Sequence, residues 1–188
     1  MGHQVGANHT FTFSSEGTLA QTEPGSGSTI MGYAGITSQD VAPHSIDIFH
    51  ATSIAQIQAN LATKTCPVST SITANNSIPV VSPVSNYTIP ISTPFALTGA
   101  ATDPNGDALT YQWEEMDAGT AAGNWNSGTK PFFMSYAPVT TPTRLFPKLA
   151  SIIAGTYTTV AGEYLPSTAQ TLKFRLTARD NKVGGGGV

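Results

Sequence analysis

The sequence predicts two parts: a short α+β segment at the N-terminus, then an all-β sandwich that lacks its last strand. Charged residues make up only 10% of the chain, and Thr, Ser, Gly, Asn and Pro are abundant, a composition that suits short strands and turns. One segment, residues 53–61, carries helical periodicity. A stretch at 63–77, rich in Thr, Ser and Asn, predicts a linker between residues 1–62 and 78–188.

Residues 1–9 are expected to finish a helix that stops at Gly6, because a glycine can adopt the left-handed conformation that turns a chain sharply. A weakly alternating segment, 10–24, predicts a short strand and a loop. Residues 25–37 are punctuated by glycine around Met31, which predicts a tight turn. This part is therefore expected to be mostly loop around one helical end.

A helix is expected to begin at Ser53, which forms a capping box with Gln56. Ile54, Ile57 and Leu61 recur at spacings of three and four, so they give the helix one apolar face. This helix is expected to close the first part.

The second part contains several short segments of strand character. Leu172, Phe174 and Leu176 alternate with polar residues, and Trp113 lies mid-strand, as a core tryptophan does in many β-sandwiches. The turn Asp103-Pro-Asn-Gly-Asp107 separates two of these segments. The expected strands are 87–91, 95–100, 109–116, 157–160 and 171–179. The Gly184–Gly187 run precedes only Val188, so we expect a final strand beyond the given sequence.

Charge and hydropathy exclude several classes of partner. The net charge of −3 gives no basic footprint, which argues against nucleic acid as a partner. No apolar run approaches about 20 residues, so no membrane span is predicted. The single cysteine, Cys66, has no internal disulfide partner and is expected to be a small buried hydrophobe or an unpaired thiol, not a nucleophile.

The spacing of His3, Gly6 and His9 matches the second half of the zinc motif H-E-x-x-H-x-x-G-x-x-H. Catalytic zinc takes three protein ligands and keeps one position open for water. Two histidines four apart on a helix face the same way, and a third reaches the metal only if the helix stops and the chain folds back. Gly6 permits that reversal. Two unrelated surface histidines are the alternative.

A methionine turn follows at a plausible distance. Met31 lies in Ser28-Thr-Ile-Met-Gly-Tyr33, 22 residues after His9. An ordinary buried methionine in a glycine turn is the other interpretation. Both features in this order, with a capped helix behind them, favour the zinc site.

On these residues, with HQVGANHTF, EPGSGSTIMGYAGI and FHATSIAQI, the first third of the chain resembles the reprolysin-like metzincin zinc metallopeptidases of secreted bacterial proteins. The resemblance covers the C-terminal part of their catalytic domain. Residues 78–183, with TDPNGDALTYQWE and FRLTARDN, resemble the immunoglobulin- or fibronectin-like module that follows it. The resemblance implies one Zn²⁺, a protein or peptide substrate, peptide-bond hydrolysis by a zinc-activated water, and a secreted, extracellular parent protein.

The resemblance assigns roles at matching positions only. His3 and His9 would be zinc ligands, and Met31 would pack under the metal without binding it. Tyr33, two residues after the methionine, would either contact zinc or stabilise the oxyanion through its hydroxyl, or else pack on the core as a turn residue. The sequence favours neither role over the other.

No residue of the chain matches the first histidine ligand or the glutamate base of the motif. We expect both directly before Met1, so that the given chain is a fragment, inactive by itself. Neither Glu16 nor Glu23 stands beside a ligand on the helix, so neither can serve as general base, and Glu23 is expected to organise its loop.

Two further sets of residues could bind a metal by their residue type but are expected to have structural roles. His44 and His50 lack ligand spacing to the other histidines. Asp103, Asn105 and Asp107 alternate as in calcium loops but lack a bidentate Glu at the expected offset, which favours a polar turn.

A different class of function is a non-catalytic extracellular binding or spacer module. On this hypothesis residues 78–188 would bind a polymer or a cell surface. The aromatic residues Phe132, Phe133, Trp125 and Tyr136 would form an exposed patch, although a place in the core is the better expectation.

Overall fold

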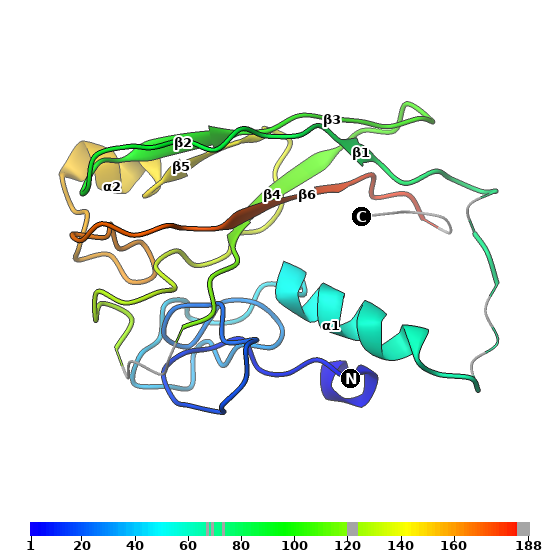
Figure 1. Cartoon of the computed structure of the whole chain (residues 1–188), viewed down its shortest axis with the longest axis horizontal. Helices are drawn as coiled ribbons and strands as arrows, with labels where there is room; N and C mark the ends of the chain where they lie inside the picture. Colours follow the sequence, from blue (N-terminus) through cyan, green and yellow to red (C-terminus); the bar gives the residue numbers. More distant parts are fainter. Residues whose placement is uncertain (67, 69, 73, 120–123, 184–188) are drawn as a thin grey trace.

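The computed structural model describes the chain except for residues 67, 69, 73, 120–123 and 184–188. Short elements joined by long irregular segments build it (Figure 1). The elements are η1 (Gly2–Val5), α1 (Ala51–Ala62), β1 (Val80–Val81), β2 (Phe95–Thr98), β3 (Ala101–Thr102), β4 (Thr110–Glu115), β5 (Thr143–Phe146), α2 (Leu149–Ala154) and β6 (Phe174–Arg179). The structure is therefore of mixed α and β class, as expected.

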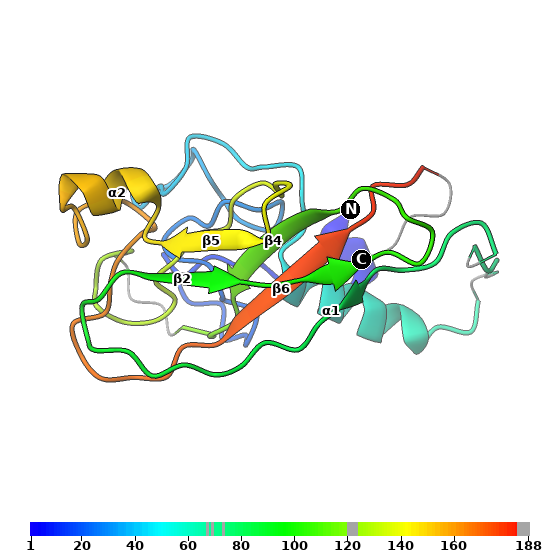
Figure 2. The ribbon, with the colours of Figure 1, turned by 90° about the horizontal axis from the view of Figure 1, so that it is seen from above.

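Within the described residues the strands form three antiparallel pairs. β2 pairs with β5 so that Phe95 lies opposite Phe146, β4 pairs with β6 so that Trp113 lies opposite Leu176, and β1 pairs with β3. In Figure 1 the pair β2–β5 lies above the pair β4–β6, and Figure 2 shows the lower pair running obliquely beneath the upper one. The pairs agree with an all-β second part, and the immunoglobulin- or fibronectin-like arrangement stays a prediction.

An aromatic core fills the space between the two strand pairs. The ring of Phe146 stacks on Phe95 at 5.0 Å between centroids and tilts against Phe174 at 4.7 Å. Phe146 and Phe132 are both 0% exposed. Trp113 belongs to the same cluster, as its place in mid-strand predicts, and its indole Nε1 donates to Pro142 O. The core is therefore built by residues from both pairs.

Three of the predicted strands are present and two are wrong. The predictions 95–100 and 109–116 correspond to β2 and β4, and 171–179 shortens to β6. The segment 87–91 forms no strand, because Pro90 lacks the N–H that a ladder needs. The segment 157–160 forms turns between Gly155 and Gly162, whose φ angles of 66° and 68° are both left-handed.

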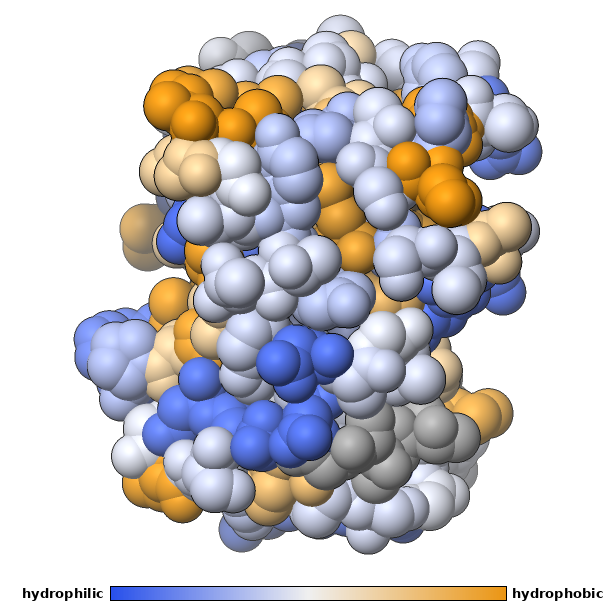
Figure 3. Space-filling model, turned by 90° about the vertical axis from the view of Figure 1, so that its left-hand side faces the viewer, coloured by the Kyte–Doolittle hydropathy of each residue, from blue (hydrophilic) through white to orange (hydrophobic). Residues whose placement is uncertain are grey.

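Three short strands and a helix were not predicted. β5 lies in a segment flanked by Pro142 and Pro147, and β1 and β3 have two residues each. The helix α2 has only six residues, and Leu149 and Ile153 on it are 56% and 78% exposed. Figure 3 shows the end of the molecule where α2 lies, with apolar side chains exposed in its upper half. Such short elements carry too little periodicity to be read from sequence.

Helix α1 begins two residues earlier than the sequence indicates, at Ala51. His50 caps it, because His50 Nδ1 accepts a hydrogen bond from Thr52 N at 3.1 Å. Ser53, the predicted cap, is 0% exposed, and its hydroxyl has no hydrogen-bond partner. The capping-box prediction is therefore wrong, because the side chain of His50, the residue before the helix, caps α1 instead of Ser53.

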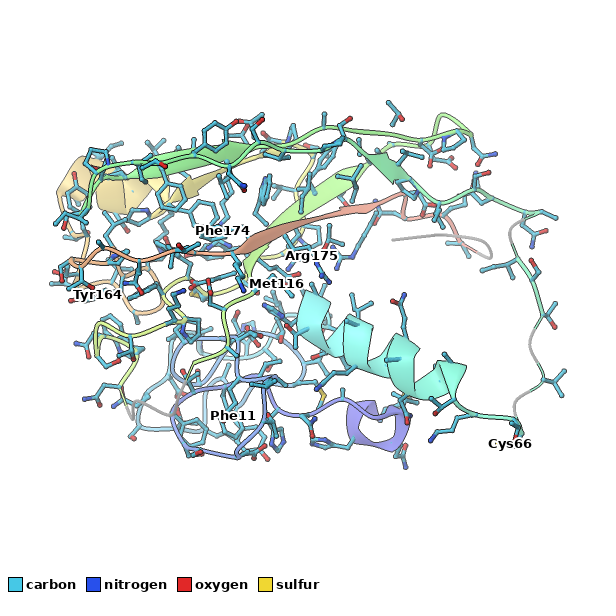
Figure 4. The ribbon with its side chains drawn as sticks, in the orientation of Figure 1. Phe11, Cys66, Met116, Tyr164, Phe174 and Arg175 are labelled. Carbon is cyan, nitrogen blue, oxygen red and sulfur yellow. The ribbon has the colours of Figure 1, made fainter. Side chains whose placement is uncertain are left out.

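The predicted turn at 103–107 is confirmed. Asp103 Oδ1 accepts hydrogen bonds from Asn105 N and Asp107 N, and Gly106 N donates to Asp103 O. None of the helices in the described part of the chain is long and apolar enough to cross a membrane. Cys66 is exposed and free in the loop that follows α1 (Figure 4), so of the two alternatives for this residue the structure agrees with the unpaired thiol.

Candidate metal centre

The N-terminal residues form one short helical turn that ends at Gly6. η1 is a 3₁₀ turn rather than the end of an α-helix, and Gly6 follows it in the left-handed conformation with φ 100°. A Cβ at Gly6 would lie 2.7 Å from Asn60 Cβ on α1, so both the backbone angle and the space require glycine here. The chain thus reverses where the sequence predicts.

Helix α1 lies just above this turn in the view of Figure 1 and holds it by two hydrogen bonds. Asn60 Nδ2 donates to Val5 O at 2.8 Å, and Gln56 Oε1 accepts from Asn8 N at 2.9 Å. These two bonds satisfy backbone groups on both sides of Gly6 that have no partner inside a helix. α1 therefore holds the ends of the segment that carries the two histidines.

The reversal brings the two predicted ligands together. His3 Nε2 and His9 Nε2 lie 2.9 Å apart, and the ring planes are inclined at 85°. Their other ring nitrogens are occupied: His3 Nδ1 lies 2.8 Å from Ala7 O, and His9 Nδ1 lies 2.6 Å from Glu16 Oε1. A carbonyl and a carboxylate only accept hydrogen bonds, so in the neutral rings each Nδ1 carries the proton.

Two unprotonated Nε2 atoms then face each other with their lone pairs. These lone pairs repel each other unless a cation lies between them, either a proton shared in an N–H···N hydrogen bond or a metal ion, so the arrangement is compatible with a shared metal ion. Zinc–nitrogen bonds are about 2.0–2.1 Å, so two ligating nitrogens must lie within about 4 Å of each other, a condition that 2.9 Å meets. A histidine that binds metal normally donates its other N–H to a carboxylate or a carbonyl, as both do here.

Met31 and Tyr33 both lie close to the segment that carries this pair. Met31 is 5% exposed and packs under η1, because a Cβ added to Gly2 would lie 2.3 Å from Met31 Sδ. It lies in a turn in which Gly32 N donates to Thr29 O. The ring of Tyr33 meets His9 edge-on at 4.6 Å and is 37% exposed. Tyr33 is therefore next to the site, and its contact with His9 suits either of the predicted roles.

Glu23 organises the loop, as the sequence indicates. It is 0% exposed and accepts hydrogen bonds from the hydroxyls of Thr10 and Thr29, each at 2.5 Å, and from Ser28 N at 2.9 Å. A carboxylate buried among these donors is fully engaged and does not face the histidine pair. Glu16, in contrast, bonds His9 directly, a role that sequence spacing does not reveal.

The remaining candidates stand apart from the histidine pair. His44 is exposed and its Nδ1 contacts the neighbouring Ser45 O, whereas His50 is 1% exposed and caps α1. Asp107 pairs with Lys182 at 3.2 Å, and Asn105 Oδ1 accepts from Ser77 N. No group of three or more His, Cys, Asp or Glu side chains suited to a metal occurs among the described residues. Within the described part of the chain, His3 and His9 are the candidate ligands that the structure brings together.

Two buried carboxyls on β4 lie behind this segment. Burial raises the pKa of Glu114, against an opposing effect of His50, and burial raises the pKa of Glu115 to about 8. Glu115 Oε2 accepts hydrogen bonds from Phe132 N and Phe133 N at 2.8 and 3.0 Å. Neither glutamate was predicted, because both stand in an otherwise ordinary strand sequence.

Comparison with known proteins agrees with this geometry over the first third of the chain. Residues 1–62 match the model of the reprolysin-like metallo-peptidase family M12B. No curated protein and no solved structure matches the chain. The family match spans the histidine pair, Met31, Tyr33 and α1. Residues 1–62 are therefore related to the reprolysin-like metallopeptidases.

Proposed function

We propose that this chain is part of a zinc-dependent metalloendopeptidase, and that His3 and His9 are two of its zinc ligands. The observation that carries the proposal is the 2.9 Å approach of the two Nε2 atoms while both Nδ1 atoms are held by acceptors. The family match of residues 1–62 supports the same reaction class, and peptidases of this class act on proteins.

When bound between these residues, zinc would supply a Lewis acid that lowers the pKa of water at the site to about 7. His3 and His9 would hold the ion, with Ala7 O and Glu16 fixing the ring orientations. Met31 would form the floor under η1. Tyr33, whose ring contacts His9, would direct its phenol toward the developing oxyanion.

No glutamate is adjacent in sequence to either histidine, so a general base of the motif type is not among the 188 residues. Two histidines also bind zinc more weakly than three. We therefore propose that the chain by itself does not hydrolyse peptides. We further propose, from the resemblance, that the parent protein is secreted.

Zinc binding tests the proposal directly. The purified chain is titrated with Co²⁺, whose visible spectrum reports nitrogen ligation, and then with Zn²⁺ in competition. We expect one ion per chain, with binding lost in His3→Ala and in His9→Ala and retained in the control His44→Ala. Equal binding by all three variants would contradict the assignment of the ligands.

A second experiment completes the motif. A short helical extension that ends in His-Glu is joined directly before Met1, and a matched extension ends in Ala-Glu. A third histidine ligand at the right place should tighten zinc binding at least about tenfold over the Ala-Glu version. The same affinity for both versions would show that η1 does not present its histidines as the zinc motif requires.

The alternative, a non-catalytic binding module, loses its main sequence feature. Phe132 and Phe133, two of the aromatic residues that could have formed an exposed patch, are 0% and 1% exposed and belong to the core. Tyr136 packs against the guanidinium of Arg144, 4.7 Å from its ring centroid. No specific observation therefore favours this second function.

A further inference from the structure

Glu114 connects β4 with helix α1, which is distant in sequence. The side chain of Trp113 faces the aromatic core, and the next side chain, Glu114, is 0% exposed and faces the N-terminal segment. Glu114 Oε2 accepts a hydrogen bond from Ala51 N at 3.1 Å, and Oε1 accepts from Ser135 Oγ at 3.1 Å. The carboxylate of a strand thus caps the first turn of the helix that supports η1.

Ser135, which Glu114 holds, in turn contacts the loop of Glu23. Its carbonyl oxygen accepts a hydrogen bond from Ser28 Oγ at 2.8 Å, between residues 107 positions apart. Ser28 N donates to Glu23 Oε1 at 2.9 Å, and the Ser28 hydroxyl lies 3.2 Å from the same oxygen. Ser28 therefore joins the second part of the chain, residues 78–183, here called the strand region, to the buried carboxylate of Glu23 in the N-terminal segment.

Glu23 completes the connection to the candidate metal centre. Its Oε2 accepts from the hydroxyl of Thr10, which directly follows His9, and from that of Thr29, two residues before Met31. Thr10 N also donates to Met31 O at 3.1 Å. One carboxylate thus fixes the segment after a predicted ligand and the turn beneath the site.

We propose that Glu114 and Ser28 are positioning residues for the metal centre, and that through them the strand region holds the segment of His9 and the turn of Met31 in place. Each member of this chain of contacts is buried, where a lost hydrogen bond is not replaced by water. On this inference the strand region is a structural part of the metal centre and not a spacer. The part of this inference that concerns the metal rests on the proposed function. The part that concerns the position of the Met31 turn does not depend on a bound metal.

The experiment uses the full chain and two variants, Ser28→Ala and Glu114→Gln. Ser28→Ala removes the bond to Ser135 O, and Glu114→Gln keeps the size and one acceptor oxygen of the side chain. Thr98→Val is the matched control, because its hydroxyl bonds Thr143 at 2.9 Å at an exposed site of the strand region. Deuterium exchange of backbone amides in residues 24–33 is measured beside that of β2 and β5, and Co²⁺ affinity is measured in parallel.

We expect amide exchange in residues 24–33 to become about tenfold faster in Ser28→Ala and less so in Glu114→Gln, with exchange in β2 and β5 unchanged. Co²⁺ affinity should fall in the same order, and Thr98→Val should match the unaltered chain. The inference would be overturned if amide exchange became faster throughout the chain, or if it did not become faster in residues 24–33. If the unaltered chain binds no metal, the proposed function fails, and the exchange result still decides whether the strand region positions the turn.

Discussion

Glu16 Oε1 lies 2.6 Å from His9 Nδ1, the ring nitrogen that does not face His3. The carboxylate fixes the tautomer of His9 and the direction of its Nε2, and it increases the electron density that Nε2 offers a metal. The ion pair is only partly buried, with exposed fractions of 15% and 34% for the two side chains. If His9 binds zinc as proposed, Glu16 would contribute through the geometry of this hydrogen bond more than through burial.

Replacing Glu16 by Ala should weaken zinc binding by about 10- to 100-fold, the usual effect of removing a group that orients a ligand. Glu16→Gln keeps an acceptor oxygen, so its zinc affinity should lie between those of Glu16→Ala and the unaltered chain. Competition titration measures both. The control is Asp40→Asn, since Asp40 bonds Thr37 away from the histidines. Unchanged affinity in Glu16→Ala would show that Ala7 O and the loop orient the pair without it.

Glu115 should make the protein less stable as the pH rises. Burial raises its pKa to about 8 from 4.5, so the folded chain binds the proton more tightly than the unfolded chain does. Its stabilising proton is present below the unfolded pKa and is lost as the pH rises through the folded one. In that window the free energy of unfolding should fall by at most about 1.4 kcal/mol per pH unit for this group.

Urea unfolding at about pH 5 and about pH 8 measures this dependence. Glu115→Gln removes the titration while keeping an acceptor for Phe132 N, so its free energy of unfolding should change less between the two conditions. A remaining slope of the same sign is expected from Glu114, whose pKa burial also raises. Identical slopes with and without the substitution would rule out a raised pKa at Glu115.

Gly2→Ala should disturb the floor of the metal centre. The added Cβ would lie 2.3 Å from Met31 Sδ and 3.1 Å from Phe49 Cε1, and overpacking of this kind costs about 1–3 kcal/mol. Thermal or urea unfolding measures the loss. In the double variant Gly2→Ala with Met31→Ala the clash is relieved. The loss in free energy of unfolding should therefore be smaller than the sum of the losses in the two single variants. Strict additivity would mean that the two residues do not touch.

Residues 1–62 expressed alone should not unfold cooperatively. Without the strand region Ala51 N loses the carboxylate of Glu114, and Ser28 Oγ loses Ser135 O. The segment holds one helix and one 3₁₀ turn, and a chain of this size buries little apolar surface. Circular dichroism during heating should show a broad, gradual change, whereas the full chain melts sharply. A sharp two-state melt of the isolated segment would contradict this expectation.

The parts of the fold that sequence predicts are those with a local signal. Apolar and polar residues alternate along the six residues of β6, and Asp103 and Gly106 mark the turn between β3 and β4 by residue type alone. The failures have local causes too. Pro90 lies in a segment that otherwise has strand character, and the six-residue α2 is too short for its periodicity to stand out. A strand or helix is therefore predicted correctly where several consecutive residues repeat its hydrophobic pattern.

The sequence by itself determines the pattern of the candidate site: the spacing of His3, Gly6 and His9, and the turn around Met31. That pattern is local because a short turn, a left-handed glycine and a second turn suffice to build it. Only the tertiary structure shows that the two Nε2 atoms converge at 2.9 Å and that Glu16 holds one ring.

The tertiary structure alone also decides what supports this site. Ala51 N and Glu114 are 63 residues apart, and Ser28 and Ser135 are 107 apart, yet each pair shares a buried hydrogen bond. No periodicity or spacing encodes such a pair, because buried polar groups take whichever partner the packing of distant segments brings within reach. The sequence therefore specifies the candidate ligands, and the packing of the strand region against their segment determines which contacts hold that segment in place.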